Sequence, residues 1–66
     1  MAFKPKNFLD LCFSMKTGAT VDIDGVVGVI SCIEREDGSG YNWNVTIRHD
    51  DGLHTTVFTR ENRLGT

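Results

Sequence analysis

The segment 41–48 reads Tyr-Asn-Trp-Asn-Val-Thr-Ile-Arg, and its apolar and polar residues alternate without interruption. Successive side chains of a strand point to opposite faces, so this pattern predicts a half-buried β-strand. Its apolar side carries Trp43, the only tryptophan of the chain. That position predicts a core residue rather than an exposed platform for stacking bases. Turn-forming residues flank the strand at 37–40 and 50–52, so we expect a small antiparallel sheet.

Three further segments favour strands, at 19–24, 26–36 and 53–60. Short Gly-bearing turns separate the strands, which is typical of an antiparallel meander. Gly28 interrupts the longest segment and is expected to serve a bulge or bend, so that the sheet curls toward a small barrel. We therefore predict a mainly β fold over residues 1–66, a single domain formed by a curled four-to-five-stranded meander or small barrel.

The start of the chain is predicted to be a short N-terminal helix or arm at 1–16, followed by the meander at 17–61. Asn7 is a good helix N-cap and Gly18 suits the helix end. Apolar residues in 7–15 are too dense for one narrow stripe. A helix here would therefore bury most of its surface or cover one end of the sheet. An extended first strand over the same residues is the alternative.

Charge argues mildly against a nucleic-acid partner, because the formal net charge is −2 and the pI is about 5.5. A domain dedicated to nucleic acid is usually basic. Cations nevertheless gather in the N-terminal quarter and the last third of the chain, which leaves a local basic face as the alternative. The residues that would contact phosphates in that case are Lys4, Lys6, Lys16, Arg48 and Arg60.

The two cysteines, Cys12 and Cys32, match no CxxC spacing and are too few for a secreted disulfide scaffold. We expect two reduced thiols in a cytoplasmic protein. The apolar run at 8–13 is short and contains Asp10, so it is a poor signal peptide. No segment approaches the ~18 apolar residues of a membrane span, and no membrane association is expected.

Asp22, Asp24 and Gly25 are similar to the DxDG signature of haloacid-dehalogenase-type phosphatases. That chemistry also needs a lysine, further carboxylates and a Rossmann-like scaffold, which a chain of 66 residues cannot supply. The same aspartates begin like a Ca²⁺ loop, but the later ligand positions hold valine and isoleucine. The alternative interpretation, a strand that ends in an Asp-Gly turn, is the one we expect.

His49, Asp50, Asp51 and His54 cluster around one predicted turn, and such side chains can bind zinc or iron. The turn itself accounts for the aspartates, and the two histidines need not face each other. Neither cysteine is accompanied by a recognisable base and orienting residue. We therefore predict no enzyme activity, no metal and no cofactor.

Residues 17–30 contain a Gly-x-x-Val-x-Ile strand, a Gly-bearing turn and a Gly-x-Ile strand. The matching positions are Gly18, Val21, Ile23, Gly25, Gly28 and Ile30. This order resembles the opening of KOW-type and related SH3-like small barrels. The resemblance implies an SH3-like barrel and admits RNA or DNA binding, although Asp22 and Asp24 stand where such domains often carry basic residues. SH3-like barrels also bind proteins through loops and edge strands, so the fold does not choose between these functions.

The predicted function is non-catalytic binding to a larger protein, as an adaptor or inhibitor, because the chain is small and acidic and has free sheet edges. It resembles small phage or mobile-element proteins that block host machinery, and such an origin is one alternative. The second prediction is a nucleic-acid-binding SH3-like or KOW-type domain that acts in transcription or translation. The predicted partner-binding residues are Tyr41, Asn42, Asn44, Arg48, Phe58 and Arg60.

Phe58 is the residue on which this surface depends. Leu53 and Val57 are an even number of positions apart and share one side of the strand, whereas Phe58 lies on the other side. Phe58 therefore lies outside the core if those two residues face inward. Closure of the barrel, or folding of the N-terminal segment over the sheet, would bury it instead. The sequence leaves both arrangements open.

Overall fold

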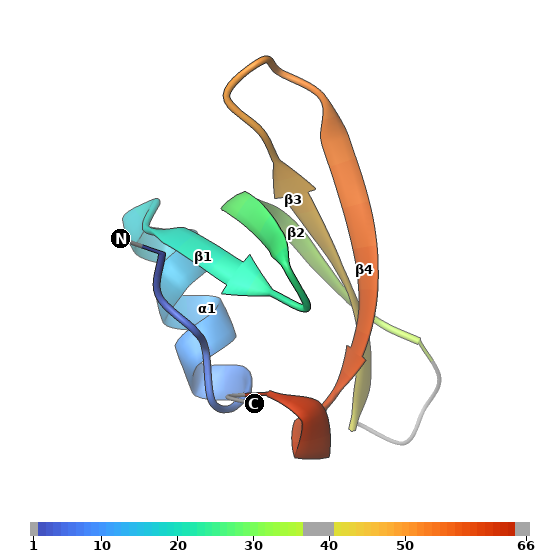
Figure 1. The fold of residues 1–66 in the computed structure, drawn as a ribbon. Coiled ribbons are helices and arrows are strands. Elements are labelled where there is room, and N and C mark those ends of the chain that lie inside the picture. The colour runs from blue at the N-terminus through green and yellow to red at the C-terminus, as the bar shows by residue number, and fades with distance from the viewer. Residues whose placement is uncertain (1, 37–40, 65–66) are drawn as a thin grey trace.

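The computed structural model describes residues 2–36 and 41–64, in which one short helix precedes a four-stranded sheet (Figure 1). The elements are α1 (Phe8–Thr17), β1 (Thr20–Ile23), β2 (Val26–Arg35), β3 (Asn42–Arg48), β4 (His54–Arg60) and the 3-10 helix η1 (Glu61–Arg63). Neighbouring strands are antiparallel and lie in chain order. This confirms the predicted curled meander with an N-terminal helix. The predicted turn at 37–40 lies outside the described residues.

The connection between β1 and β2 is a tight Asp-Gly turn. Ile23 pairs with Val26 across it, and Asp24 and Gly25 both have positive φ angles, of 53° and 84°. Two such residues are typical of the type I′ hairpin turn. A carboxylate oxygen of Asp22 accepts a hydrogen bond from the Gly25 N–H at 3.0 Å. The aspartates of the DxDG segment therefore serve the hairpin turn, as predicted.

The N-terminal arm pairs with the outer edge of β1. Phe3 forms an isolated parallel bridge with Val21. The Phe3 N–H donates to the Thr20 carbonyl at 2.9 Å, and the Phe3 carbonyl accepts from the Asp22 N–H at 2.9 Å. This edge of the sheet is thus covered by the chain itself.

The ends of α1 follow the capping signals of the sequence. The Asp10 N–H donates to the Asn7 side-chain oxygen at 2.9 Å. At the other end, Gly18 has a left-handed φ of 72° and its N–H donates to the Ser14 carbonyl. The prediction of a helix is confirmed, and the alternative of an extended first strand is wrong.

Only one side of α1 packs against the sheet. Leu11 and Ser14 are buried, whereas Leu9 and Phe13 are 77% and 67% exposed. These two residues are four positions apart and share the opposite side of the helix. Of the two alternatives predicted for this helix, burial of most of its surface is therefore wrong, because its dense apolar residues point both toward and away from the sheet.

The core lies between α1 and the inner face of the curled sheet (Figure 1). Trp43 is 2% exposed, and its ring stacks on Phe8 with centroids 5.1 Å apart and planes inclined by 26°. This confirms the core position of Trp43. The other buried apolar residues are Leu11, Val21, Ile23, Ile30, Val45, Ile47, Val57 and Leu64.

Two features of the long strand β2 lie where the sheet curls, a β-bulge and a glycine packed closely on β3. Its register with β3 shifts between Ile30 and Cys32, which makes Ser31 the extra residue of a β-bulge. The bulge changes the alternation, so Ile30 is buried while Cys32 is exposed. Gly28 lies where β2 packs closely on β3, because a Cβ there would collide with the Arg48 carbonyl oxygen.

Candidate functional site: the outer face of β3 and β4

The polar side of β3 and the matching side of β4 form one continuous surface on the side of the sheet away from α1 (Figure 1). Antiparallel pairing sets residues directly opposite one another on the same side. The pairs on this surface are Asn42–Arg60, Asn44–Phe58, Thr46–Thr56 and Arg48–His54. We call these residues the outer face. The register thus confirms that the polar residues of both strands share one side.

Phe58 lies exposed within the outer face, with 41% of its surface accessible. The inward positions on either side of it are filled by Val57 and Thr59, which are both buried. The Arg60 guanidinium carbon lies 5.9 Å from the centroid of the Phe58 ring, within the range of a cation–π contact. Of the two arrangements left open by the sequence, the one that buries Phe58 is wrong.

The bulge at Ser31 extends the outer face onto β2. Cys32 pairs with Thr46, and Glu34 pairs with Asn44. The Asn44 side-chain amide also donates to the carboxylate of Glu36. The sequence does not reveal these neighbours, because uninterrupted alternation from Ile30 would turn Cys32 and Glu34 toward the core.

One end of the outer face carries a shallow hollow of about 250 Å³ beside Arg60. It is lined by Tyr41, Asn42, Arg60, Glu61 and Asn62. Tyr41 is exposed, as its position at the strand start predicts, and its carbonyl accepts from the Glu61 N–H at 3.0 Å. The hollow and the Arg60 side chain thus lie together at this end of the outer face.

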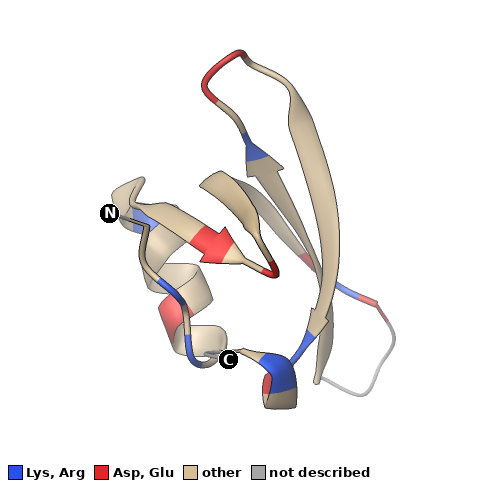
Figure 2. Ribbon diagram, viewed as in Figure 1, with Lys and Arg blue, Asp and Glu red and all other residues tan. Residues whose placement is uncertain are grey.

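The basic residues predicted to contact phosphates do not form one track (Figure 2). Arg48 and Arg60 share the outer face but occupy its opposite ends, about 20 Å apart along the strands. Lys4 and Lys6 lie on the N-terminal arm and Lys16 near the end of α1, on the other side of the molecule. The fold therefore places two of the five predicted cations on one face, at its opposite ends.

The two histidines do not converge on a common point. Because a carbonyl can only accept, His49 Nδ1–H donates to the Val27 carbonyl at 2.9 Å. The Nε2 atom forms a second hydrogen bond, with the Thr55 hydroxyl, at 2.7 Å. His49 thus ties the hairpin tip to β2, while His54 lies opposite Arg48. Within residues 2–36 and 41–64, no three His, Cys, Asp or Glu side chains group closely enough to hold a metal.

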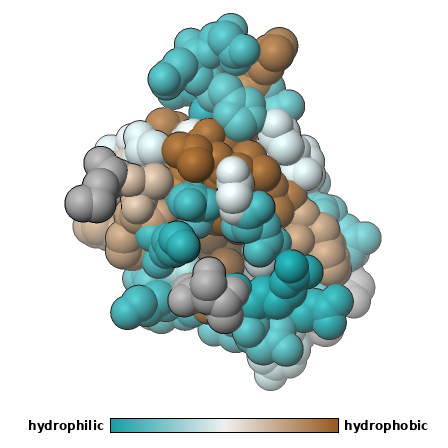
Figure 3. Space-filling model, viewed as in Figure 1, coloured by the Kyte–Doolittle hydropathy of each residue, from teal (hydrophilic) through white to brown (hydrophobic). Residues whose placement is uncertain are grey.

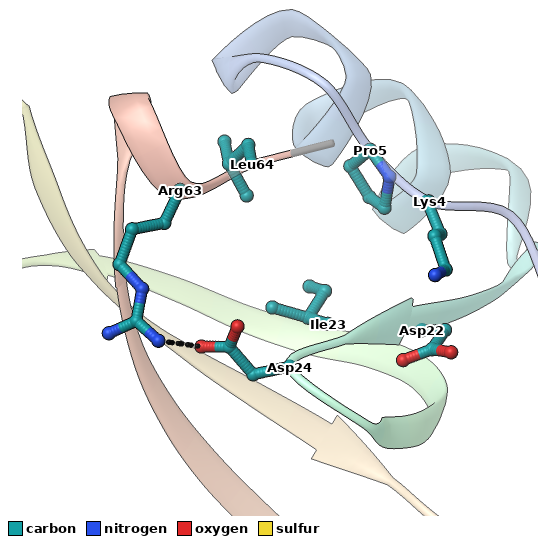
Figure 4. A pocket seen from close by; sticks show the side chains of 7 residues that line it. All are labelled: Lys4, Pro5, Asp22, Ile23, Asp24, Arg63 and Leu64. Carbon is teal, nitrogen blue, oxygen red and sulfur yellow. Dashed lines mark ion pairs between the residues drawn. The ribbon is translucent and has the colours of Figure 1, made fainter. Parts of the chain in front are cut away.

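A small hollow near the C-terminal end of the described chain has a structural role (Figure 4). Its volume is about 10 Å³, too little for an organic ligand. Arg63 and Asp24 form an ion pair across it at 3.5 Å, and Pro5 and Leu64 are buried beside it. These contacts hold the segment after β4 against the β1–β2 turn.

A wider hollow, of about 400 Å³, lies between the start of β2 and the tip of the β3–β4 hairpin. Figure 3 shows apolar surface in this part of the molecule, bordered above by hydrophilic residues. Val27 and Val29 line the hollow together with Asp50 and Asp51. Its histidine, His49, uses both ring nitrogens in hydrogen bonds, so the lining combines apolar side chains with the carboxylates of the hairpin tip.

Comparisons of the chain with protein-family models, with curated protein sequences and with solved structures find no match. The resemblance to KOW-type and SH3-like barrels therefore stays a prediction. In the described part of the chain, no helix has the length and hydrophobicity required to span a bilayer. The geometry of the outer face is thus the main guide to function.

Proposed function

We propose that this chain is a non-catalytic protein-binding module that docks on a larger protein through its outer face, as an adaptor or inhibitor. The observation that carries the proposal is the exposed Phe58 ring with Arg60 beside it on a strand that pairs with β3 along its whole length. Aromatic and arginine side chains are the usual anchors of protein interfaces. Because β4 already fixes their backbone, little conformational freedom is lost on binding.

The surroundings of Phe58 support the same proposal. Asn42, Asn44 and Thr46 are half-buried polar residues that can form the hydrogen-bonding rim of an interface. The chain exposes 4326 Å², and a standard interface covers roughly 800 Å² of each partner. An interface of that size occupies nearly a fifth of the surface, so it must extend across both strands rather than Phe58 alone.

The proposal is tested by immobilising the protein and its variants and comparing how tightly each captures a partner from nuclease-treated cell lysate. We expect Phe58→Ser and Arg60→Glu, made singly, to lower the affinity for the captured partner by about 30-fold, because loss of an interface anchor costs about 2 kcal/mol or more. Phe13→Ser and Lys16→Glu are the matched controls, since they remove an exposed phenylalanine and a cation from α1. Cooperative thermal unfolding of every bait shows that the fold is retained.

The same wild-type and variant proteins also show whether the proposal is wrong. Capture that survives both Phe58→Ser and Arg60→Glu but is lost in Phe13→Ser places the interface on α1 instead. Capture that disappears after nuclease treatment of the wild-type sample points to a nucleic acid as the true partner. Either result contradicts docking of a protein on the outer face.

Nucleic-acid binding is the second candidate, because Arg48 and Arg60 share the outer face with an exposed aromatic ring. Phosphate contacts from the arginines and base stacking on Phe58 would be the elements of such a site. The net negative charge and the dispersal of the lysines favour the protein partner over this candidate.

Salt dependence distinguishes the two candidates. Each phosphate neutralised adds about −0.9 to the slope of log affinity against log salt for duplex DNA. With two arginines on the outer face, we expect weak binding and a slope no steeper than about −3. The measurement is fluorescence anisotropy with labelled duplex DNA over a range of salt concentrations. Tight binding at physiological salt that is abolished by Arg48→Glu and Arg60→Glu would reverse the order of the candidates.

A further inference from the structure

The hydrogen-bond register of the β3–β4 hairpin determines which backbone groups of β4 point outward. The His49 N–H donates to the Leu53 carbonyl at 2.8 Å, and the Glu61 N–H donates to the Tyr41 carbonyl at 3.0 Å. Hydrogen-bonded and non-hydrogen-bonded pairs alternate in an antiparallel ladder, and this register is continuous. The odd-numbered residues of β4 therefore bond to β3. The residues whose N–H and C=O groups point to the free edge are His54, Thr56, Phe58 and Arg60.

This edge has little of the usual protection of an edge strand, because Arg60 at its end is the only Lys, Arg, Asp or Glu residue of β4. At the opposite edge of the sheet, the N-terminal arm pairs with β1 through Phe3. By contrast, β4 is the last strand of the sheet and contains no proline, no lysine and no bulge over its 7 residues. Proteins commonly use those features to prevent pairing with another chain. An exposed strand without them is a template for an added strand.

The charged side chains around this edge favour a partner segment of opposite charge. Neither β3 nor β4 contains a carboxylate, whereas the outer face carries Arg48, His54 and Arg60. The carboxylate of Glu34 on β2 lies two strands from β4, about 10 Å away in the sheet. The carboxylate of Glu36 is nearer, but it accepts a hydrogen bond from the Asn44 side-chain amide in the middle of the outer face, away from Arg48 and Arg60 at its ends. In an antiparallel second copy of β4 centred on Val57, Arg60 would lie opposite His54 and two strand spacings, about 10 Å, from Arg48. An acidic segment would complement these cationic residues instead.

Carboxylates reappear just beyond both ends of β4. Asp51 lies in the hairpin tip, where it accepts a hydrogen bond from the Leu53 N–H, and Glu61 begins η1. Negative charge on a partner is therefore favourable only opposite the strand itself. This restricts the acidic residues of an added strand to the span between His54 and Arg60.

From these observations we propose that the free edge of β4 binds an extended acidic segment of a protein partner by strand addition. The proposal rests on the proposed function and specifies its binding mode and the chemistry of the partner. Backbone hydrogen bonds to Thr56 and Phe58 hold the added strand. Its outward side chains lie beside Phe58, and its carboxylates lie near His54 and Arg60.

A synthetic peptide tests strand addition without knowledge of the natural partner. The probe is Asp-Thr-Val-Thr-Val-Thr-Asp, which places both carboxylates and both valines on one face of a strand. A counterpart with lysine in place of aspartate is the charge control. In an NMR titration at low salt, we expect the acidic peptide to bind at least about tenfold more tightly. It should also slow amide exchange at His54, Thr56, Phe58 and Arg60.

Two substitutions separate backbone pairing from side-chain contact. Thr56→Pro removes an N–H that points to the free edge, a place where strands tolerate proline. Thr56→Ala removes the side chain and keeps that N–H. We expect about tenfold weaker peptide binding in Thr56→Pro and little change in Thr56→Ala. Amide protection in the wild-type protein provides the test on its own if Thr56→Pro does not fold.

The outcomes distinguish this proposal from the proposed function. Strand addition is overturned if those four amides stay unprotected, or if both peptides bind equally well. Loss of partner capture in Phe58→Ser would then still support the outer face as a side-chain interface. Peptide binding together with undiminished capture by Phe58→Ser and Arg60→Glu contradicts the proposed function instead. Concentration-dependent protection with a doubled molar mass in the free protein would show that a second copy occupies the edge.

Discussion

Trp43→Ala is expected to unfold the domain at room temperature. The indole is 2% exposed and stacks on Phe8, so its removal leaves a cavity between α1 and the sheet. Truncation of a buried aromatic residue costs about 3–5 kcal/mol. A core in a chain of this length supplies roughly 3–5 kcal/mol in total. Circular dichroism during urea titration should therefore show no cooperative transition for this variant.

Trp43→Phe is the matched control. It retains an aromatic ring against Phe8 and removes the indole N–H, which is buried without a hydrogen-bond partner among the described residues. A buried unsatisfied donor costs about 1–3 kcal/mol, so its removal offsets part of the lost packing. We expect a folded, cooperative protein of lower stability. Wild-type stability in Trp43→Ala would contradict the central place of this residue in the core.

Gly28→Ala is expected to destabilise the domain strongly, although it adds only one methyl group. A Cβ at this position would overlap the Arg48 carbonyl oxygen and approach the Ile47 Cγ2 atom to 2.6 Å. The carbonyl belongs to the backbone and cannot rotate away, so β2 and β3 must separate where the sheet curls. Overpacking of this kind costs about 1–3 kcal/mol or more. Chemical denaturation measures the loss as a lower midpoint.

Gly18→Ala provides the comparison at an open position. Gly18 has a φ of 72°, but no atom lies within 4 Å of the site where its Cβ would stand. The cost there is conformational only, about 1–2 kcal/mol. We expect Gly28→Ala to lower the midpoint further than Gly18→Ala. The reverse order would show that the two strands are not closely packed at Gly28.

Local signals in the sequence predict much of this fold. The alternation in 41–48 specifies β3 and the burial of Trp43 because the period of a strand is independent of its partners. Asn7 and Gly18 mark the ends of α1 since each satisfies backbone groups within one helical turn. The short turn after β3 likewise allows the prediction that polar residues of both strands share the outer face.

Features that depend on distant residues are not predictable in this way. The bulge at Ser31 is defined only against β3, yet it decides that Glu34 joins the outer face. Leu53 is apolar but lies in the hairpin tip, beyond the last pair of β3 and β4, and is therefore 67% exposed. The exposure of Phe58 likewise depends on how far the sheet closes. The alternation along the strand predicts on which side Phe58 lies, but it does not predict whether that side is covered.

Amide hydrogen exchange along β4 in the free protein most directly tests the open edge on which strand addition depends. We predict slow exchange at Thr55, Val57 and Thr59, because their N–H groups bond to β3. Fast exchange is predicted for the amides that point to the free edge, at His54, Thr56, Phe58 and Arg60. Equal protection of both sets at dilute concentration would contradict an open edge, and with it the availability of β4 to an added strand.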